Sequence, residues 1–317
     1  MSSLKNPEIV IFGYGPVGRA TGELLAKRGQ AFRVVQRSSP SDLPVGGSFA
    51  PADIENLDQV RAAMKGAKQI VLSIGLPYFG KVWRKLWPLA MHNIIEAAAE
   101  IGARLVFVDN LYMYGPQTVP LVETMPLTDF GVKPAVRAEV TRIWLTASDA
   151  GRIRVAALRA PDFYGPGCTN SHLGEFAFGA LAKGKTAQFV VSPDQPHDVA
   201  YVPDFARAVV TLLDAPDDAF GQAWHVPCAP TRTLREIFAL GAAALAVKPK
   251  ATVLPRWSLA PLGLFMPILG EMREMQFQWD RPYRVDASKF AQRFWSDATP
   301  FEISATATAL SFARPAA

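Results

Sequence analysis

Short apolar runs alternate with longer amphipathic segments over the first half of the chain. Five runs rich in Val, Ile and Leu predict buried strands, at 8–13, 31–37, 69–75, 104–110 and 154–161. Four segments with apolar residues at helical spacing separate them, at 16–29, 57–66, 83–101 and 135–151. Strands that alternate with helices predict a doubly wound α/β fold, in which helices cover both faces of a parallel sheet.

The alternation stops after Gly165. Beyond it the sequence predicts a helix near 172–183, a short strand and helix within 199–216, and a tail from 226 that is rich in Pro and Trp. We therefore predict two domains. The sheet domain comprises 1–165 and about 197–225, and a smaller lobe comprises about 166–196 and 226–317.

A glycine-rich turn follows the first predicted strand. Gly13, Gly15 and Gly18 form a G-x-G-x-x-G pattern that ends the strand and opens a helix, and Pro16 and Val17 lie between them. Glycines in this pattern let the backbone approach a pyrophosphate at the helix amino terminus, where free N–H groups and the helix dipole favour negative charge. The pattern predicts a Rossmann domain that binds a dinucleotide through these five residues.

The residues after the second predicted strand bear on the choice of dinucleotide. An NAD-selective site places Asp or Glu there against the ribose hydroxyls, whereas this chain has Gln36, Arg37 and Ser38. A neutral residue followed by a guanidinium suits a 2′-phosphate, which Arg can meet with two parallel charged hydrogen bonds. We therefore expect Arg37 and Ser38 to bind the cofactor, with NADP(H) preferred and NAD(H) as the alternative.

Composition and charge narrow the class of protein. Half of the residues are hydrophobic and 19% are charged, which is typical of a globular protein. The 33 basic residues are scattered among 28 acidic ones, which argues against nucleic-acid binding despite a net charge of +5. The sequence shows two cysteines without metal-ligand spacing, no apolar segment of ~18 residues and no signal-peptide layout. We predict a cytoplasmic protein that binds a small-molecule substrate, with no metal site and no membrane contact.

Three further motifs resemble those of a known family. They are DNLYMYGP at 109–116, LRAPDFYGPG at 158–167 and HDVAYVPDFA at 197–206, and LSIG at 72–75 accompanies them. With the glycine pattern, they make the chain similar to the extended short-chain dehydrogenase/reductase superfamily, the NAD-dependent epimerase/dehydratase group. The resemblance implies an enzyme that transfers hydride, with a Rossmann sheet and a smaller carboxyl-terminal substrate-binding lobe.

The resemblance also implies further ligand contacts. For the cofactor these are Asp53, Ser73, Gly75, Lys133 and Asp162, and for the substrate they are Tyr78, Tyr164 and His197. Because His197 stands where many sugar-nucleotide enzymes of this group carry an Arg for the substrate's phosphates, it argues against a sugar nucleotide. The aromatic segment 273–290 is expected to lie mainly in the core.

The catalytic positions depart from the family's pattern. The usual Ser or Thr falls on Asn110, and the Tyr-x-x-x-Lys pair falls on Lys133 and Arg137, so the signature tyrosine is missing. Tyr112 and Tyr114 are candidates to replace that phenol, because residues two apart on an extended segment share a side and can both face a pocket. The alternative for Tyr114 is packing as part of the Tyr-Gly turn, which leaves Tyr112 as the main candidate. We predict that Asn110 and Tyr112 bind the carbonyl oxygen of the substrate. Lys133 and Arg137 are expected to support cofactor binding and proton transfer.

Three functions stay open from the sequence. The leading one is an NADP-dependent oxidoreductase that interconverts a carbonyl and an alcohol by hydride transfer at a nicotinamide. An NAD(P)-dependent epimerase or dehydratase, with no net redox change, is the alternative within the enzyme class. A catalytically silent NADP-binding sensor or regulatory protein would keep the dinucleotide site and lose the chemistry along with the tyrosine.

The helix predicted at 83–101 bears on the oligomeric state. Its apolar side carries Leu86, Leu89, Ala90, Ile94, Ala97 and Ala98. This is more than one contact with a sheet needs, and in the resembling family such a helix often pairs with its mate from a second subunit. We therefore predict a homodimer.

Overall fold

The computed structural model describes residues 7–255, 257 and 266–313 of the 317-residue chain. The chain divides into two compact units. Unit 1 comprises Met1–Met113, Val132–Arg159 and Phe205–Trp224, and unit 2 comprises Tyr114–Gly131, Ala160–Asp204 and His225–Ala317. Each unit is thus assembled from segments that are not contiguous in the sequence.

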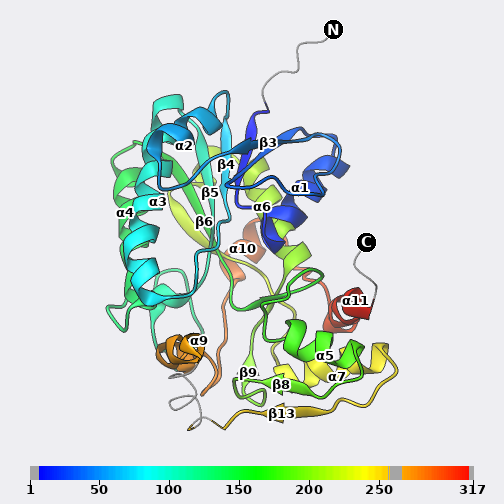
Figure 1. Ribbon diagram of the computed structural model, residues 1–317. Coiled ribbons are helices and arrows are strands. Elements are labelled where there is room, and N and C mark those ends of the chain that lie inside the picture. The colour runs from blue at the N-terminus through cyan, green and yellow to red at the C-terminus, as the bar shows by residue number, and fades with distance from the viewer. Residues whose placement is uncertain (1–6, 256, 258–265, 314–317) are drawn as a thin grey trace. The chain divides into compact units, whose positions relative to one another are not determined.

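Unit 1 is built on a seven-stranded sheet with the order β11-β6-β5-β4-β1-β2-β3 (Figure 1). The strands are β1 (Ile9–Phe12), β2 (Phe32–Gln36), β3 (Gly47–Pro51), β4 (Gln69–Leu72), β5 (Arg104–Asp109), β6 (Arg154–Arg159) and β11 (Gln222–His225). The five neighbouring pairs from β6 to β3 are all parallel. The predicted α/β fold with a Rossmann-type parallel sheet is confirmed.

The hydrophobic pattern does not predict β3. Its sequence, GSFAP, contains Gly, Ser and Pro, and its residues are half-buried or exposed because the strand lies at the edge of the sheet. An edge strand lacks the neighbours that cover a central strand, so it needs no continuous apolar run. β3 is therefore recognised only from its pairing with β2.

Helices cover both faces of this sheet (Figure 1). One layer contains α2 (Leu57–Met64), α3 (Gly80–Ile101) and α4 (Lys133–Asp149), and the other contains α1 (Pro16–Lys27) and α6 (Val202–Asp214). The first layer encloses a core that includes Trp144 of α4 and the alternate residues Val10 and Phe12 of β1. Alternation along the strands thus divides the apolar residues between the two layers.

The long helix α3 begins at Gly80, earlier than predicted, and continues through Pro88. Ala90, Ile94 and Ala97 are buried within the chain, where α3 packs against α2 and α4. The apolar side of α3 therefore has partners inside one chain, and the homodimer stays a prediction. Within the described ranges, no helix combines the length and the hydropathy needed to cross a membrane.

Unit 2 contains short strand pairs and short helices. β7 (Phe163–Tyr164) and β10 (Ala200–Tyr201) pair in parallel, β9 (Pro196–His197) and β12 (Arg232–Thr233) antiparallel, and β8 (Ala187–Phe189) and β13 (Ala251–Val253) in parallel. Its helices are the π-helical η2 (Gly174–Gly179), α5 (Ala180–Ala182), α7 (Leu234–Ala244), α9 (Pro267–Glu271), η5 (Arg273–Gln278), α10 (Ser288–Arg293) and α11 (Phe301–Ala313). The aromatic segment 273–290 buries Phe277, Tyr283 and Phe290 in this unit, as expected. Two further single turns are η1 (Tyr112–Tyr114) and η3 (Asp217–Ala219).

Candidate active site

The glycine loop joins β1 to α1 and has the backbone that its sequence predicts. Gly13 has a φ of +88°, and a side chain at Gly18 would place its Cβ 2.2 Å from the carbonyl oxygen of Gly13. Neither position accepts a larger residue. Ser73 at the end of β4 donates a hydrogen bond from Oγ to the same carbonyl at 2.8 Å, so it ties the loop to the neighbouring strand.

Gly15 faces open space at the amino terminus of α1. A Cβ built there meets no atom within 4 Å, no side chain caps the helix, and its first turn contains no acidic residue. Pro16 stands in the first helical turn, and Val17 and Gly18 are buried behind the loop. Free backbone N–H groups next to open space fit the pyrophosphate of a dinucleotide, because the helix dipole favours an anion at this end.

The predicted selectivity residues follow β2. Gln36 Oε1 accepts a hydrogen bond from the N–H of Tyr14 at 3.2 Å, and Gln36 Nε2 donates to the carbonyl oxygen of Ser38 at 2.8 Å. Arg37 and Ser38 are exposed, and the Arg37 side chain forms no hydrogen bond or ion pair with another described residue. Where an NAD-selective site carries a carboxylate, this site therefore presents a neutral amide with an available guanidinium beside it.

Asp53 and Gly75 lie at the same edge of the sheet. Asp53 follows β3, and its carboxylate accepts a hydrogen bond from the N–H of Glu55 at 3.0 Å. Gly75 follows β4, is exposed, and has open space at its Cβ position. The carboxyl ends of β1 to β4 thus carry the glycine loop, Arg37, Ser38, Asp53, Ser73 and Gly75, which are expected cofactor contacts. This is the edge where open α/β sheets bind ligands.

An aromatic cluster follows, formed by Tyr78, Trp83, Trp87, Phe107 and Tyr112. The rings of Trp83 and Tyr112 are stacked with centroids 6.0 Å apart, and Trp83 also packs edge-on against Tyr78 at 5.4 Å and Trp87 at 5.9 Å. Sequence reasoning finds Tyr78 and Tyr112 and misses both tryptophans. Their helical spacing in α3 looks the same as that of ordinary core residues.

Two buried cations of α4 lie against the aromatic cluster. Lys133 Nζ is 4.7 Å from the ring centre of Tyr78, and the guanidinium carbon of Arg137 is 4.2 Å from Trp87 and 4.9 Å from Phe107. Lys133 has 0% of its surface exposed and Arg137 1%. Aromatic faces attract cations, so these rings compensate part of the lost hydration. The structure thus brings Tyr112, Lys133 and Arg137 together around one cluster.

Asp109, the last residue of β5, is the carboxylate that faces Arg137. It forms a buried ion pair with Arg137, and its Oδ2 lies 3.5 Å from Nε of Arg159, the last residue of β6. The parallel register of β5 and β6 places Asp109 directly beside Arg159. The guanidinium of Arg137 is therefore held between Trp87, Phe107 and Asp109. This position suits a residue that fixes α4, and the expected support of cofactor binding and proton transfer by Arg137 stays a prediction.

The turn after β5 differs from the extended segment expected at 110–114. Asn110 Oδ1 accepts a hydrogen bond from the N–H of Tyr112 at 3.0 Å and so begins the 3-10 turn η1. Tyr112 is half-buried against Trp83, whereas Tyr114 is buried in unit 2, where its hydroxyl lies 2.9 Å from His225 Nε2. The expectation that the two phenols share a side is wrong, because the backbone is helical there.

The remaining predicted residues lie in unit 2. The hydroxyl of Tyr164 is 2.5 Å from Ser304 Oγ, and the side chain is 1% exposed; burial raises its pKa. His197 is also 1% exposed, with Nδ1 3.0 Å from the carbonyl oxygen of Gln278 and Nε2 3.1 Å from Asp162 Oδ2. Both side chains have internal partners, and their substrate contacts stay predictions.

A family model described as the NAD dependent epimerase/dehydratase family matches residues 9–226. The chain belongs to this family. No curated protein matches the sequence. The family is one of enzymes, so the predicted enzyme class is confirmed. Membership of the family does not decide between NAD and NADP or between net redox chemistry and epimerisation.

Solved structures share the fold of this family member. The Bordetella bronchiseptica enzyme WbmH in complex with NAD+ is 18% identical with a TM-score of 0.74, covering 96% of this chain and 97% of that chain. The dTDP-glucose 4,6-dehydratase DesIV double mutant from Streptomyces venezuelae, with NAD and DAU bound, is 15% identical with a TM-score of 0.79 and 96% coverage of both chains. UDP-glucose 4-epimerase from Thermus thermophilus in complex with NAD is 19% identical with a TM-score of 0.75, covering 96% of this chain and 98% of that chain. Matches over both full lengths support a shared architecture.

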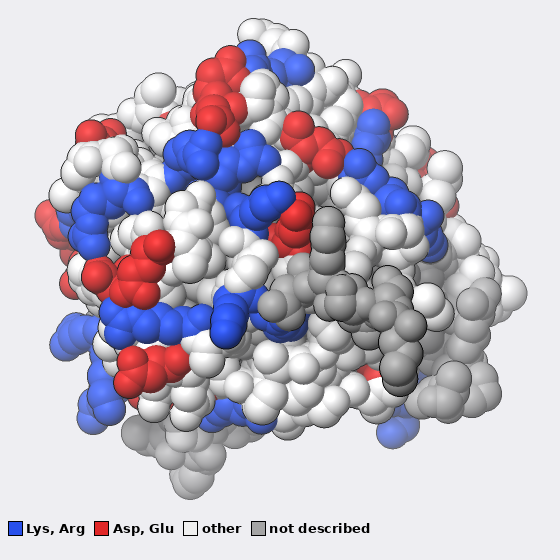
Figure 2. Space-filling view, turned by 90° about the horizontal axis from the view of Figure 1, so that it is seen from above, with Lys and Arg blue, Asp and Glu red and all other residues white. Residues whose placement is uncertain are grey.

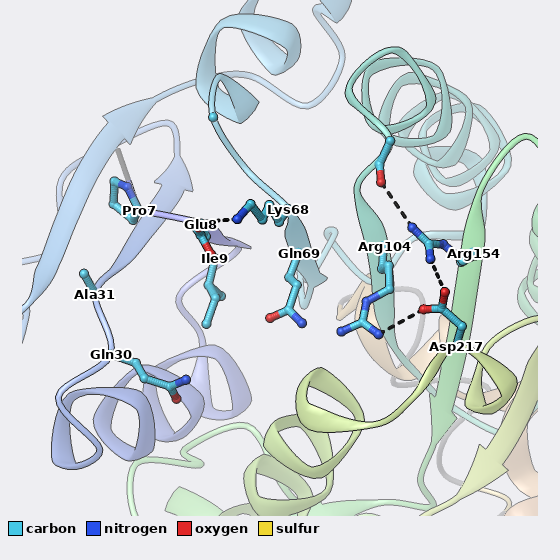
Figure 3. A pocket seen from close by; sticks show the side chains of 12 residues that line it. Pro7, Glu8, Ile9, Gln30, Ala31, Lys68, Gln69, Arg104, Arg154 and Asp217 are labelled. Atoms are coloured by element: carbon cyan, nitrogen blue, oxygen red, sulfur yellow. Dashed lines mark hydrogen bonds and ion pairs between the residues drawn. The ribbon is translucent and has the colours of Figure 1, made fainter. Parts of the chain in front are cut away.

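A pocket of about 890 Å3 lies elsewhere in unit 1, at the amino ends of the strands (Figure 3). Its size suits a small molecule. Its charged side chains already pair with one another, Lys68 with Glu8, and both Arg104 and Arg154 with Asp217. Open α/β sheets bind ligands at the carboxyl ends of their strands, so we assign no catalytic role to this pocket.

The charged surface is mixed. On the face in Figure 2, basic and acidic side chains lie next to one another. Exposed ion pairs of unit 1, such as Arg152 with Glu96 at 2.7 Å, show the same interspersion. On this face the described residues therefore do not form a continuous basic patch of the kind that binds a nucleic-acid backbone.

The open space at Gly15 predicts a selective effect on nucleotide binding. Gly15→Ala should leave thermal unfolding unchanged, because φ is −75° and the new methyl group meets nothing. The affinity for NADPH should fall at least about 10-fold, since the methyl group occupies the approach of the pyrophosphate. Fluorescence titration measures this. Gly18→Ala is the contrasting variant, and it should lower stability as well, by its contact with Gly13. Unchanged NADPH affinity in Gly15→Ala would place the pyrophosphate elsewhere.

The ion cluster predicts a large effect on stability. Asp109→Asn keeps the shape of the side chain and leaves Arg137 and Arg159 buried without their carboxylate. The free energy of unfolding, measured in urea, should therefore fall by about 3–5 kcal/mol. The exposed pair Lys68–Glu8 provides the control, and Glu8→Gln should change stability little. Equal stabilities of the two variants would show that Asp109 does not hold the buried cations.

Proposed function

We propose that this protein transfers hydride between a nicotinamide and the alcohol or carbonyl carbon of a small molecule, with net oxidation or reduction and with NADP(H) as the preferred cofactor. The observation that carries the proposal is the grouping of Tyr112 and buried Lys133 around the packed rings of Trp83 and Tyr78, with Tyr112 in the turn that follows the carboxyl end of β5. The glycine loop opens at the carboxyl end of β1 in the same parallel sheet. The glycine loop for the cofactor and the Tyr112–Lys133 group for the proton transfer thus lie on the same edge of the sheet.

Different residues of unit 1 would bind the cofactor and donate the proton in such a reaction. Gly13, Gly15 and Gly18 fit the pyrophosphate, and Ser73 fixes their loop. When bound, the nicotinamide supplies or accepts the hydride. As a carbonyl carbon gains hydride its oxygen gains a proton, and we assign the donation of this proton to the Tyr112 hydroxyl or the Lys133 ammonium.

Two of the predicted catalytic residues act through others in this proposal. Asn110 positions Tyr112, because its side-chain oxygen is taken up by the Tyr112 N–H. Arg137 positions Lys133, which lies four residues earlier on the same side of α4, because its guanidinium is fixed by Asp109. We propose Asp162 as a positioning residue of unit 2 rather than a contact of the cofactor.

The preference for NADP(H) is supported by the residues after β2. The available guanidinium of Arg37 can pair with a 2′-phosphate, and no carboxylate of Gln36–Ser38 opposes it. The neighbours crystallised with NAD support nicotinamide dinucleotide binding in general and leave this preference to experiment.

Two other functions have specific support. An epimerase or dehydratase is favoured by the family, and among the neighbours are a UDP-glucose 4-epimerase and a dTDP-glucose 4,6-dehydratase. A sugar nucleotide would then be the substrate, and hydride would return without net redox change. A silent NADP-binding sensor is favoured by the missing tyrosine. We also propose a cytoplasmic location and a homodimer that uses Leu86 and Leu89, which are half-buried on α3.

Cofactor selectivity should respond to Gln36→Asp. The new carboxylate repels a 2′-phosphate and accepts hydrogen bonds from ribose hydroxyls, so the Kd for NADPH should rise at least about 10-fold and the Kd for NADH should fall. Arg37→Ala should raise the Kd for NADPH and leave the Kd for NADH unchanged. Fluorescence titration at fixed ionic strength measures all four constants. Wild-type protein that binds NADH at least as tightly as NADPH would contradict the proposed preference.

Turnover should depend on Tyr112 and Lys133. Tyr112→Phe and Lys133→Met remove the proposed proton donors, and each should lower kcat by about 10²–10⁴-fold while NADPH still binds. The assay follows NADPH absorbance, with NADPH supplied to ketones and aldehydes and NADP+ supplied to UDP-glucose and dTDP-glucose, and exposed Lys85→Met of α3 is the control.

The same assay separates the three functions. NADPH consumed during turnover indicates net reduction, product without NADPH change indicates an epimerase or dehydratase, and binding without turnover across the panel indicates a sensor. Full activity in both Tyr112→Phe and Lys133→Met would refute the assignment of these residues.

A further inference from the structure

The segment that follows β4 in unit 1 is almost entirely apolar. Residues 74–79 read IGLPYF, with no charged residue and with the hydroxyl of Tyr78 as the one polar side-chain group. Ile74 and Leu76 are half-buried, and Phe79 is 38% exposed. Because the segment leaves the carboxyl end of a central strand, it lies at the edge where open α/β sheets bind ligands.

This segment lies next to Tyr112. The Trp83 ring packs edge-on against Tyr78 at 5.4 Å and is stacked on Tyr112 at 6.0 Å. The strands that precede the two tyrosines, β4 and β5, pair in parallel, and the same hydrophobic core supports both tyrosines and the aliphatic side chains of the segment. We call these side chains the apolar wall, which consists of Ile74, Leu76, Tyr78, Phe79 and Tyr112.

The cations of the candidate active site lie below the surface of the wall. Arg137 is 1% exposed and forms its ion pair with Asp109, which is 5% exposed. Lys133 is 0% exposed, and its Nζ lies 4.7 Å from the ring centre of Tyr78. These charges therefore add nothing to the exposed part of the wall. Of the two proposed proton donors, Tyr112 is the one with an exposed part.

The polar groups beside the wall match those of a single carbonyl. Asn110 Oδ1 accepts a hydrogen bond from the N–H of Tyr112, whereas its Nδ2 donates to no described residue. A carbonyl oxygen can thus find a donor at this place. Hydroxyl groups on the carbons next to the carbonyl, as in a sugar, would lose their hydration against the wall without gaining a partner.

We propose that the apolar wall makes the protein specific for apolar aldehydes and ketones, in which the carbonyl carbon carries alkyl or aryl groups, and for the corresponding alcohols. The inference rests on the proposed function. In reduction, the carbonyl carbon gains the hydride of NADPH and its oxygen gains the proton of Tyr112, which gives the alcohol and NADP+; Tyr112 then takes a proton from water. The wall selects the groups on that carbon by burying their apolar surface.

A binding experiment tests the wall without turnover. Pentan-3-ol and glycerol have the same shape, but glycerol carries hydroxyls where pentan-3-ol carries its two methyl groups. The complex of the protein with NADPH cannot oxidise an alcohol, and ligand-observed NMR should give it a Kd for pentan-3-ol at least about 10-fold below that for glycerol. Leu76→Asn and Phe79→Ser should each reduce this preference with an unchanged Kd for NADPH.

The control for these variants is Leu310→Asn of α11, at a leucine that is 38% exposed in unit 2. It should keep the preference of the wild type. Equal Kd values for the two alcohols in the wild type, or an unchanged preference in both Leu76→Asn and Phe79→Ser, overturns the proposal.

A turnover experiment tests the same preference on the reacting carbonyl. Pentan-3-one and 1,3-dihydroxyacetone differ by the same two replacements, and NADPH absorbance follows the reduction of both. The ratio of their kcat/KM values should shift toward dihydroxyacetone at least about 10-fold in Leu76→Asn, mainly through KM. Comparing the ratio between two proteins cancels the different reactivities of the ketones. The same ratio in the wild type and in both wall variants contradicts the inference.

The two experiments distinguish a failure of the inference from a failure of the proposed function. If no carbonyl compound is reduced, but the wall variants weaken the binding of pentan-3-ol, the proposed function fails and the apolar specificity is upheld. If carbonyl compounds are reduced without any preference for the apolar member of each pair, the proposed function is upheld and the apolar specificity is refuted.

Discussion

The buried pairing of Arg137 with Asp109 sets the position of the candidate active site. Asp109 ends β5, and the register of β5 with β6 places Arg159 beside it. Arg137, in the first turns of α4, forms an ion pair with this carboxylate. The pair therefore connects the helix to the carboxyl edge of the sheet. Lys133 lies four residues earlier on the same side of α4, and the pairing therefore brings it to that edge as well.

Such an arrangement is costly, and the aromatic cluster explains how it persists. Removing charges from water costs several kcal/mol per ion, and here Arg137 and Arg159 share the buried carboxylate of Asp109. Aromatic faces interact favourably with cations in place of water. Trp83 and Trp87 lie four residues apart in α3, so one side of that helix supplies both the stacking surface for Tyr112 and a wall for Arg137.

The sequence predicts those parts of the site that depend on the local backbone. The glycine loop is recognisable because its φ of +88° at Gly13 and the close approach at Gly18 require glycine. The roles of Asn110, Tyr164 and His197 were not predictable in this way. The role of each residue depends on its hydrogen-bond partner, which is either distant in the sequence or brought close by a turn. A linear pattern of residues does not contain that information. Resemblance places a residue in the fold and leaves its hydrogen-bond partners undetermined.

The hydrogen bonds and ion pairs within the protein distinguish polar side chains that are fully paired among the described residues from those that keep an available atom. Arg137 and His197 are both buried, and each lies against a carboxylate of its own unit. Arg37 and His172 are also polar, yet each keeps an atom that no described residue occupies. For His172 this contrast is sharp, because the same oxygen of Asp162 faces both histidines and only one of them is left with an available nitrogen.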